Sequence, residues 1–275
     1  MTILTLSQGA VADILSRAEA PLLAAAAPIA AAVRESPAVG PDETSARVKG
    51  KTWRQWVLLG STAICHVVAN TRAAFVVTTF MGGAQPEVWV ADRRGGQQGH
   101  GATRQMCLAH LLRDAAHASE AAETRSVCRW DGGFAPGLRL LLLRAMAIGK
   151  RRTAPKDSTL APYNAGLERQ LDRLLSGPMP ERPAARRLFR AMRRDRDDLF
   201  RFVIRRDVPY TSNACERALR PSAIFRKVTG GFRAEWGARV HAAAVSIIAT
   251  GRLHGLTAFG ALRAALAGKA VMQTA

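Results

Sequence analysis

The chain has 275 residues, of which 48% are hydrophobic, enough for a sizeable core in one large domain or two small ones. Its 40 Lys and Arg against 21 Asp and Glu give a formal net charge of +19, which disfavours a plain metabolic enzyme and favours a polyanionic partner. Nucleic acid is therefore the first candidate partner, ahead of a membrane surface, because no amphipathic lipid-binding segment stands out.

The amino-terminal part is predicted to be a helical segment followed by strands. Residues 11–33 are Ala-rich and helical in pattern, with a break near Pro28. Two strands are predicted at 53–60 and 63–70, joined by a tight Gly-Ser-Thr connection. The apolar run at 72–81 fits either a third strand or a short helix.

Helices dominate the rest of the chain. A short buried strand at 87–91 ends on Asp92, a Gly-rich loop covers 93–101, and the pattern becomes helical from Arg104 onward. The predicted helices begin at 106–112 and continue with 138–149, 160–175, 184–202, 213–219, 236–251 and 257–267. Strands thus come first and helices later, with a helical half between Asp92 and Glu216.

The cysteines and apolar runs bear on the cellular compartment. The four cysteines show no CxxC pair; they are Cys65, Cys107, Cys128 and Cys215. The first ten residues lack the basic start and the apolar core of a secretory signal. The longest apolar stretches, 22–33 and 138–148, are too short to span a bilayer. We expect a cytoplasmic, nucleoid-associated protein with free thiols and no membrane partner.

Three acids far apart in the sequence lie at the ends of predicted elements: Asp42, Asp92 and Glu216. Phosphodiester cleavage needs charge neutralised at the attacking and the leaving oxygen, which two Mg²⁺ ions held by carboxylates achieve. Mg²⁺ prefers oxygen ligands and keeps several waters, so few protein carboxylates are required. These acids are therefore a candidate set of ligands for metal-assisted phosphoryl chemistry.

Each of these acids also has a local role open to it. Asp42 fits a turn-forming residue, and Asp92 fits a solvated ion pair with the arginines that follow it. Glu216 lies three residues after Asn213, which fits a reciprocal helix cap. Because the 21 acids offer many triples, spacing alone leaves the functional and the local interpretation both open.

Four separated segments form a more specific pattern. The first is Asp-Glu-Thr at 42–44, with Arg47, Gly50 and Trp56 after it; the second is Val-Trp-Val-Ala-Asp at 88–92, followed by Gln97. The third is Gln-Met-Cys-Leu-Ala-His-Leu-Leu-Arg-Asp at 105–114, and the last is Asn-Ala-Cys-Glu-Arg-Ala-Leu-Arg-Pro at 213–221 with Phe-Arg-Lys at 225–227. In residues and order, covering nearly the whole chain, they resemble the catalytic region of transposases of the insertion-sequence-66 family.

The resemblance implies a mixed α/β fold: a ribonuclease-H-like core with a large helical insertion between the second and third acids. It implies a DDE triad of Asp42, Asp92 and Glu216, with Mg²⁺, or Mn²⁺ in its place, as cofactor. The expected chemistry is nicking of DNA at the ends of an insertion element by activated water, after which the freed 3′-hydroxyl attacks target DNA. The implied partners are element ends, target DNA, further copies of the chain on DNA and accessory element-encoded proteins.

The predicted division has four parts: a helical segment at 1–36, ribonuclease-H-like strands at 37–103, a helical insertion at 104–207, and 208–275 with the third acid and the closing helices. Family members usually carry a helix-turn-helix and zinc-binding portion before the core, so a shortened copy is expected. The family usually has two Asn before its Ala-x-Glu motif, and here Ser212 stands in place of the first. Pro41 predicts a short or distorted strand before Asp42. A non-catalytic DNA-binding remnant and another ribonuclease-H-like nuclease stay open as alternatives.

Polar residues near the third acid are candidate DNA contacts, namely Asn213, Arg217, Arg220, Arg226, Lys227 and Arg233. The first three would share one helix face with Glu216. The alternative is a solvated face whose arginines pair with acids. The basic run at 184–202 has the same two interpretations.

Cys107 and His110 form a C-x-x-H pair. Such a pair is either half of a zinc site, which needs two more ligands, or a buried structural pair. Because His110 follows Asp92 closely, it is also a candidate supporting residue behind the catalytic acids.

Overall fold

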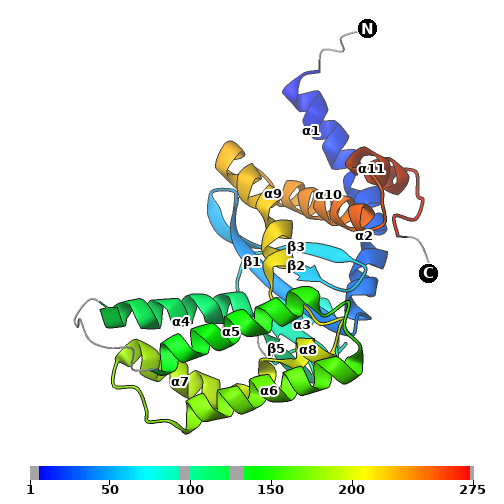
Figure 1. Ribbon diagram of the computed structural model, residues 1–275. Helices are drawn as coiled ribbons and strands as arrows, with labels where there is room; N and C mark the ends of the chain where they lie inside the picture. Colours follow the sequence, from blue (N-terminus) through cyan, green and yellow to red (C-terminus); the bar gives the residue numbers. More distant parts are fainter. Residues whose placement is uncertain (1–5, 93–98, 124–132, 273–275) are drawn as a thin grey trace. The chain divides into compact units, whose positions relative to one another are not determined.

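A computed structural model of the chain describes residues 6–92, 99–123 and 133–272 (Figure 1). The fold is mixed α/β, and the chain divides into two compact units. The first unit comprises Met1–Glu87, Arg94–Ala102 and Ala214–Ala275, and the second comprises Val88–Arg93 and Thr103–Asn213. The division at 36, 103 and 207 inferred from the sequence stays a prediction.

Three antiparallel strands make up the sheet of the first unit: β1 (Ala38–Val48), β2 (Lys51–Leu59) and β3 (Ile64–Ala69). A two-residue turn joins β1 to β2, and both of its residues, Lys49 and Gly50, have positive φ, as tight hairpins require. The strands predicted at 53–60 and 63–70 are confirmed.

The prediction of a short strand before Asp42 was wrong. β1 has 11 residues, and each one from Gly40 to Val48 has a register partner in β2. In an antiparallel pair, only alternate residues exchange hydrogen bonds with a given neighbour, so a proline without an N–H fits at a position that does not donate. Pro41 is accommodated in this strand opposite Leu58.

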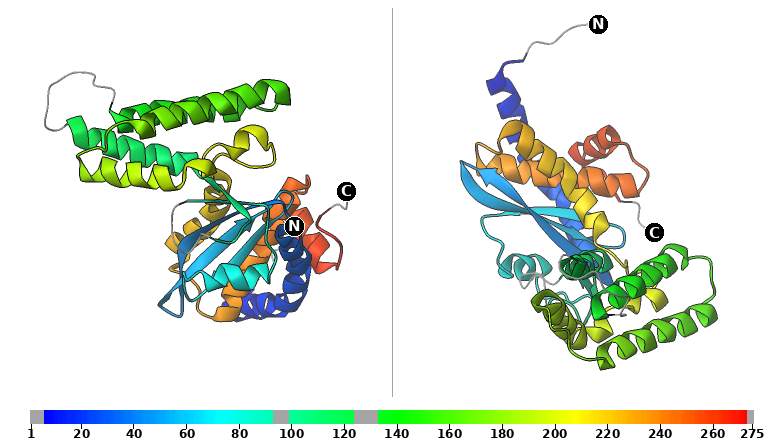
Figure 2. Two further views of the ribbon diagram at one scale, coloured as in Figure 1. Left: turned by 90° about the horizontal axis from the view of Figure 1, so that it is seen from below. Right: turned by 60° about the vertical axis from the view of Figure 1, so that its left-hand side comes forward.

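The helices of the first unit are α1 (Gln8–Arg17), α2 (Glu19–Arg34), α3 (Phe75–Met81), α9 (Asn213–Thr229), α10 (Glu235–Leu253) and α11 (Ala258–Leu266), and Asn213 itself belongs to the second unit. α10 packs against both β3 and α2 (Figure 2).

Within the run at 72–81, residues Phe75–Met81 form a short helix rather than a third strand. The predicted break near Pro28 was wrong, because that proline lies inside α2 and the helices separate at Ala18. Buried Ile29 and Val33 anchor α2 beyond the proline.

Two hydroxyls of α10 bind the backbone of β3. The Thr250 hydroxyl accepts from the Ile64 N–H at 3.0 Å and lies 3.1 Å from the Ile64 carbonyl oxygen. The Ser246 hydroxyl accepts from the His66 N–H at 2.7 Å. Four residues of helix rise about 6 Å and two residues of strand about 6.6 Å, so an i, i+4 pair matches an i, i+2 pair. The helix thereby satisfies strand groups that would otherwise be buried without partners.

The second unit holds two parallel strands, β4 (Val88–Ala91) and β5 (Thr103–Met106). Its helices are α4 (Leu108–Glu123), α5 (Phe134–Arg151), α6 (Asp157–Ser176), α7 (Pro183–Arg194), the 3₁₀ turn Arg196–Asp198 and α8 (Arg201–Ile204). The strand predicted at 87–91 and the helices at 138–149 and 160–175 are confirmed. β5 was missed, because the pattern from Arg104 was interpreted as helical.

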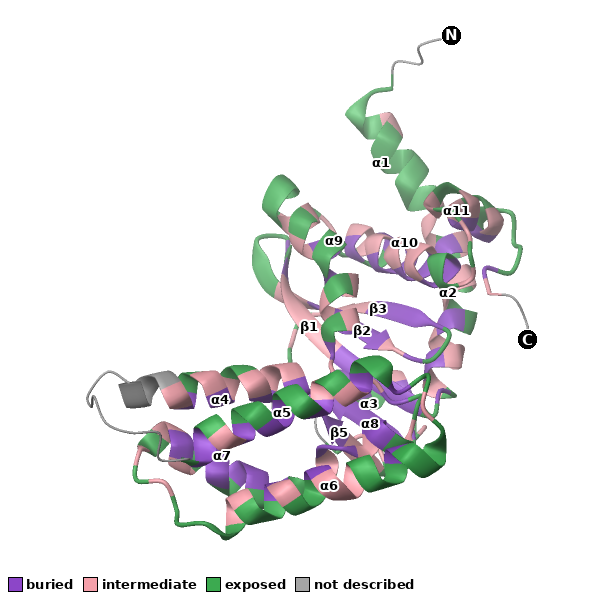
Figure 3. Cartoon of the chain, in the orientation of Figure 1, coloured by how far each residue is buried: buried purple, intermediate pink, exposed green. Residues whose placement is uncertain are grey.

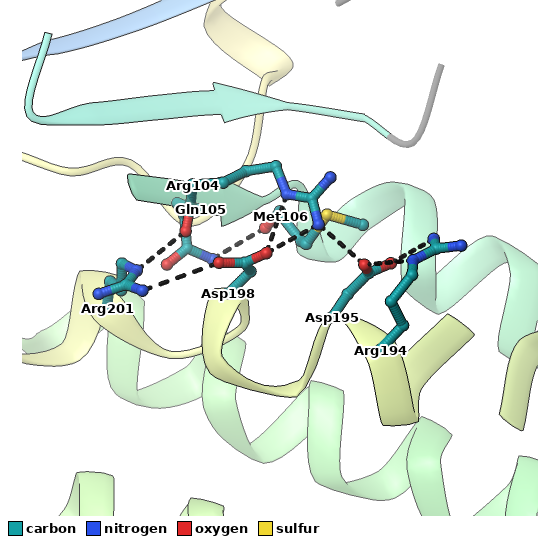
Figure 4. A network of polar contacts seen from close by, with 7 residues as sticks. All are labelled: Arg104, Gln105, Met106, Arg194, Asp195, Asp198 and Arg201. Carbon is teal, nitrogen blue, oxygen red and sulfur yellow. Dashed lines mark hydrogen bonds and ion pairs between the residues drawn. The ribbon is translucent and has the colours of Figure 1, made fainter. Parts of the chain in front are cut away.

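A charged network explains why the helix predicted at 184–202 is broken. The Arg104 guanidinium of β5 donates to Asp198 at 2.9 and 2.7 Å and to Asp195 at 2.8 Å (Figure 4). Burial alone would raise the pKa of Asp195, but contacts with Arg194 and Arg104 outweigh it and hold that pKa below its usual value. The chain leaves the helical path after Arg194 so that both carboxylates reach β5.

Two bent helix pairs, α1 with α2 and α10 with α11, have the length and apolar composition needed to cross a membrane when each pair is taken together. No single helix among the described residues is long and apolar enough to do so.

Candidate active site

Asp42 lies near the middle of β1, opposite Val57 of β2. Its carboxylate accepts a hydrogen bond from the Glu43 N–H at 2.8 Å, and the residue is half-buried. The local interpretation of Asp42 as a turn former does not hold, since it sits within a strand. A half-buried carboxylate held by a strand is suited to binding a cation.

The neighbouring acid, Glu43, has a different environment. Successive strand residues point to opposite faces, so Asp42 and Glu43 diverge. The Glu43 side chain is only 4% exposed and forms an ion pair with Arg72 at 2.9 Å. That pairing gives Glu43 a structural partner that holds it away from the Asp42 side of the strand.

Glu216 lies in the first turn of α9. Two nearby residues of the same helix, Cys215 just before it and Leu219 three positions after it, are buried against Val57 and Ile64 of the sheet. The Cys215 thiol donates to the Gly40 carbonyl at 3.3 Å. Glu216 itself is half-buried, at the border between the buried face of α9 and its exposed face.

A second contact holds α9 further along β1. The Arg226 guanidinium donates to the Ser45 carbonyl at 2.5 Å and to the Ser45 hydroxyl. Cys215 and Arg226 are eleven helical residues apart, and Gly40 and Ser45 are five strand residues apart; both distances are about 16 Å. α9 therefore runs along β1 in the same direction. Glu216 directly follows Cys215 and Asp42 lies two residues after Gly40, so both acids are close in sequence to the Cys215–Gly40 contact.

The loop after α9 adds a third attachment to β1. The Phe232 N–H donates to the Arg47 carbonyl at 2.8 Å, and the Lys49 N–H donates to the Phe232 carbonyl at 2.9 Å. Gly231 has a φ of 114°, and a Cβ there would lie 2.4 Å from the Arg47 carbonyl oxygen. Only glycine permits this approach, which gives the glycine at position 231 a structural reason.

The third acid, Asp92, belongs to the second unit. It directly follows β4, whose Ala91 pairs with Met106 of β5. The Cys107 N–H donates to the Ala91 carbonyl at 3.0 Å, so Asp92 and Cys107 leave the same end of this strand pair. Asp92 is half-buried.

Cys107 and His110 are partners of each other beside this strand end. The Ser212 N–H and hydroxyl both lie 3.2 Å from the Cys107 sulfur. Burial alone would raise the pKa of Cys107, but hydrogen bonds with His110 and Ser212 outweigh it and lower the pKa. The bond with Cys107 raises the pKa of His110, and the negative charge of Asp92 adds to this rise. The charge of Asp92 therefore acts electrostatically on His110.

In the described part of the chain, no three or more His, Cys, Asp or Glu side chains are grouped so that they could hold a metal ion. This holds for Asp42, Asp92 and Glu216, which are not grouped in this way, as well as for Cys107 and His110. Cys128 lies outside the described residues. The interpretation of Cys107 and His110 as a structural pair fits their surroundings, since Cys107 is buried, His110 is half-buried, and Ser212 and His110 both contact the Cys107 sulfur.

The predicted DNA-contacting residues fall into two groups. Five are exposed, namely Asn213, Arg217, Arg220, Lys227 and Arg233, whereas Arg226 is half-buried on Ser45. α9 continues to Thr229, through Pro221, beyond the predicted end at 219. The pairing of Arg226 with Ser45 was missed, because nothing in the local sequence connects positions 181 residues apart.

The comparisons with known proteins identify the family of the chain. A family model described as the IS66 family of transposases matches residues 2–240, a range that includes the three acids and every predicted DNA-contacting residue. A search among curated proteins found no match.

Proposed function

The chain belongs to the IS66 family of DDE transposases, and from this premise we propose that it is a DNA transposase catalytic core. Its reaction would be phosphodiester cleavage at the ends of an insertion element followed by strand transfer to target DNA. Asp42, Asp92 and Glu216 would supply the metal-binding carboxylates, on a ribonuclease-H-like arrangement of strands.

The observation that supports this proposal most is the attachment of α9 to β1. Cys215 and Arg226 bind Gly40 and Ser45 at matched spacings, so the helix and the strand that carry Glu216 and Asp42 are attached to each other at two points. Two acids 174 residues apart in sequence (216 − 42) thus belong to one compact unit. A purely local role for each acid does not require this pairing.

The donor chemistry fits a hard divalent cation, because the three proposed ligands are carboxylates and Mg²⁺ or Mn²⁺ prefers oxygen. Asp42, Asp92 and Glu216 would hold the metal. When bound, it would neutralise charge on the phosphate and lower the pKa of the attacking water. His110 and Cys107 support the strand end from which Asp92 leaves, and the hydrogen bond on Asp42 orients its carboxylate.

DNA would be held by the exposed polar residues of α9 and the loop after it. Arg217, Arg220 and Lys227 carry charge toward solvent, and Asn213 and Arg233 lie at the two ends of this segment. Phosphate contacts of this kind position the backbone without reading sequence. By analogy with the family, we propose that the chain acts as a nucleoid-associated homo-oligomer on element-end and target DNA, with accessory proteins of the element.

The test is metal-dependent nicking of supercoiled DNA by the purified chain and by Glu216→Gln. The variant removes one anionic ligand but keeps the shape of the side chain, so we expect nicking in Mg²⁺ or Mn²⁺ to fall roughly 100-fold or more, with DNA affinity retained. Glu235→Gln is the matched control, because Glu235 is an exposed acid of the same unit that pairs with Lys49. It should nick like the unchanged chain.

Three other outcomes would redirect the assignment. Salt-sensitive DNA binding without nicking by the unchanged chain would identify a non-catalytic remnant. Nicking without joining of a 3′-end to target DNA would identify another ribonuclease-H-like nuclease. Equal nicking by Glu216→Gln and the unchanged chain would remove Glu216 from the catalytic set.

A further inference from the structure

α9 exposes a continuous stripe of side chains opposite the face that it packs on the sheet. The stripe consists of Arg217, Arg220, Ile224, Lys227 and Val228, all exposed and spaced at helical intervals. Figure 3 shows exposed segments along α9 in green. Ile224 is 61% exposed and Val228 is 80% exposed. Val228 is the most exposed large hydrophobic side chain among the described residues.

The stripe combines this apolar surface with unbalanced positive charge. Arg217, Arg220 and Lys227 have no ion-pair partner in the part of the chain that the structure describes. Glu216 lies beside the stripe and is half-buried rather than exposed. A surface of three cations around two branched aliphatic side chains suits a partner that presents negative charge and apolar groups close together.

DNA has this combination in its major groove, where phosphates line the edges and each thymine presents a C5-methyl group. We propose that the stripe of α9 lies in the major groove of DNA, with Ile224 and Val228 against thymine methyls and the cations on flanking phosphates. The proposal rests on the DNA-binding function proposed above and adds to it a contact that distinguishes A·T from G·C pairs.

The dimensions of the helix are compatible with this mode. From Arg217 to Val228 the stripe runs about 16 Å, which corresponds to about five base pairs at 3.4 Å each. The major groove is wide enough for an α-helix, whereas the minor groove, about 6 Å wide, is not. Ile224 and Val228 are one turn apart, so both can reach bases along one groove.

A second copy of the chain is a poorer occupant for this surface. A twofold contact would place the stripe against itself, bringing three cations of one copy to three of the other. Each copy also carries a net charge of +19, and like charges oppose such an association.

The experiment measures the affinity of the full chain for two short A·T-rich duplexes of the same sequence, one with thymine and one with deoxyuridine throughout. Deoxyuridine lacks only the C5-methyl group. We expect the unchanged chain to bind the thymine duplex more tightly, by about fourfold for each methyl in contact. Ile224→Ala and Val228→Ala should each reduce this ratio, and the double variant should bring it close to one.

The matched control is Phe259→Ala, which truncates a side chain that is 74% exposed on α11 of the same unit. It should keep the ratio of the unchanged chain. The salt dependence of binding should be the same in all these variants, because none of them removes a charge.

Two results would overturn the inference. One is salt-dependent binding of both duplexes with equal affinity by the unchanged chain, which would leave the proposed function intact. The other is a change from oligomer to monomer in Ile224→Ala or Val228→Ala with an unaltered ratio, which would assign the stripe to contacts between copies. Absence of DNA binding by the unchanged chain would instead remove the proposed function itself.

Discussion

A single buried histidine links the acidity of the medium to the stability of the first unit. His66 of β3 is 4% exposed, and the Gln55 amide lies 3.4 Å from its Nδ1. Its Nε2 is buried without a hydrogen-bond partner among the described residues. Burial lowers the pKa of His66 to about 3, with a smaller contribution from His241. The imidazole is therefore neutral in the folded protein at ordinary pH.

This arrangement predicts a component of acid sensitivity. The pKa of His66 is about 3 in the folded chain and near 6.5 when unfolded, so protonation favours unfolding. Its contribution to stability is complete above about pH 6.5 and is lost as the pH falls toward about 3, by at most about 1.4 kcal/mol per pH unit. In His66→Gln, urea denaturation across this range should show a shallower loss of unfolding free energy.

The control for this measurement is His117→Gln, since His117 is exposed on α4. It should keep the pH dependence of the unchanged chain. If His66→Gln and the unchanged chain lose stability in parallel from pH 6.5 downward, His66 is not neutral in the folded state.

At the scale of the element, α9 has two faces with separate roles. Adjacent helical residues are turned by about 100° from one another, so Arg226 and Lys227 differ in direction although they are neighbours. Arg226 binds Ser45 of β1, and Lys227 is exposed on the stripe. Arg226 is therefore expected to act by positioning the helix that carries Glu216, and Lys227 by contact with DNA.

Comparing Arg226→Ala with Lys227→Ala tests this separation. Loss of the Arg226 bonds should lower the unfolding free energy by about 2 kcal/mol and slow nicking, with the dissociation constant for DNA nearly unchanged. Lys227→Ala should weaken DNA binding and leave thermal stability and the rate of nicking at saturating DNA unchanged. Arg226→Lys, which keeps one donor for Ser45, should recover part of the stability and of the nicking rate.

A different distribution of effects would refute the assignment. If Arg226→Ala weakens DNA binding as strongly as Lys227→Ala does, without loss of stability, Arg226 contacts DNA rather than β1.

How well each element could be predicted depends on the range of the contacts that form it. The helices at 138–149, 160–175, 236–251 and 257–267 follow from apolar side chains repeating at helical spacing, and the structure confirms them. β5 could not be recognised, because its four residues, Thr-Arg-Gln-Met, show no apolar alternation. Its Arg104 and Gln105 bind residues more than ninety positions away.

For the candidate site, the sequence carried the motif but not its supports. The predicted helix at 213–219 contains Glu216 and the predicted strand at 87–91 ends on Asp92, and the structure agrees with both placements. Ser45, Gly40 and Ser212 contribute backbone or hydroxyl groups to contacts with Arg226, Cys215 and Cys107, which lie more than one hundred positions away. Such residues have no periodicity or composition that signals them, so only a three-dimensional structure reveals them.

At the scale of the whole molecule, the net charge of +19 raises the question of whether DNA affinity depends on total charge or on its position. Many of the arginines pair with acids, as Arg104, Arg194 and Arg205 do. Those on the exposed stripe of α9 form no ion pair with any residue that the structure describes. Total charge steers any polyanion toward the protein, whereas only charges in contact with phosphates release counterions on binding.

Two double variants of equal charge separate these cases. Arg217→Ala with Arg220→Ala, and Arg252→Ala with Lys269→Ala, each reduce the net charge from +19 to +17, since two cations are removed. All four residues are exposed and belong to the first unit. The slope of log affinity against log salt concentration should become shallower by about 2 in the first variant, because each phosphate contact contributes about 0.9. It should be unchanged in the second. Equal slopes in the two variants would mean that DNA is attracted by the overall charge, and the stripe of α9 would then have no particular place in binding.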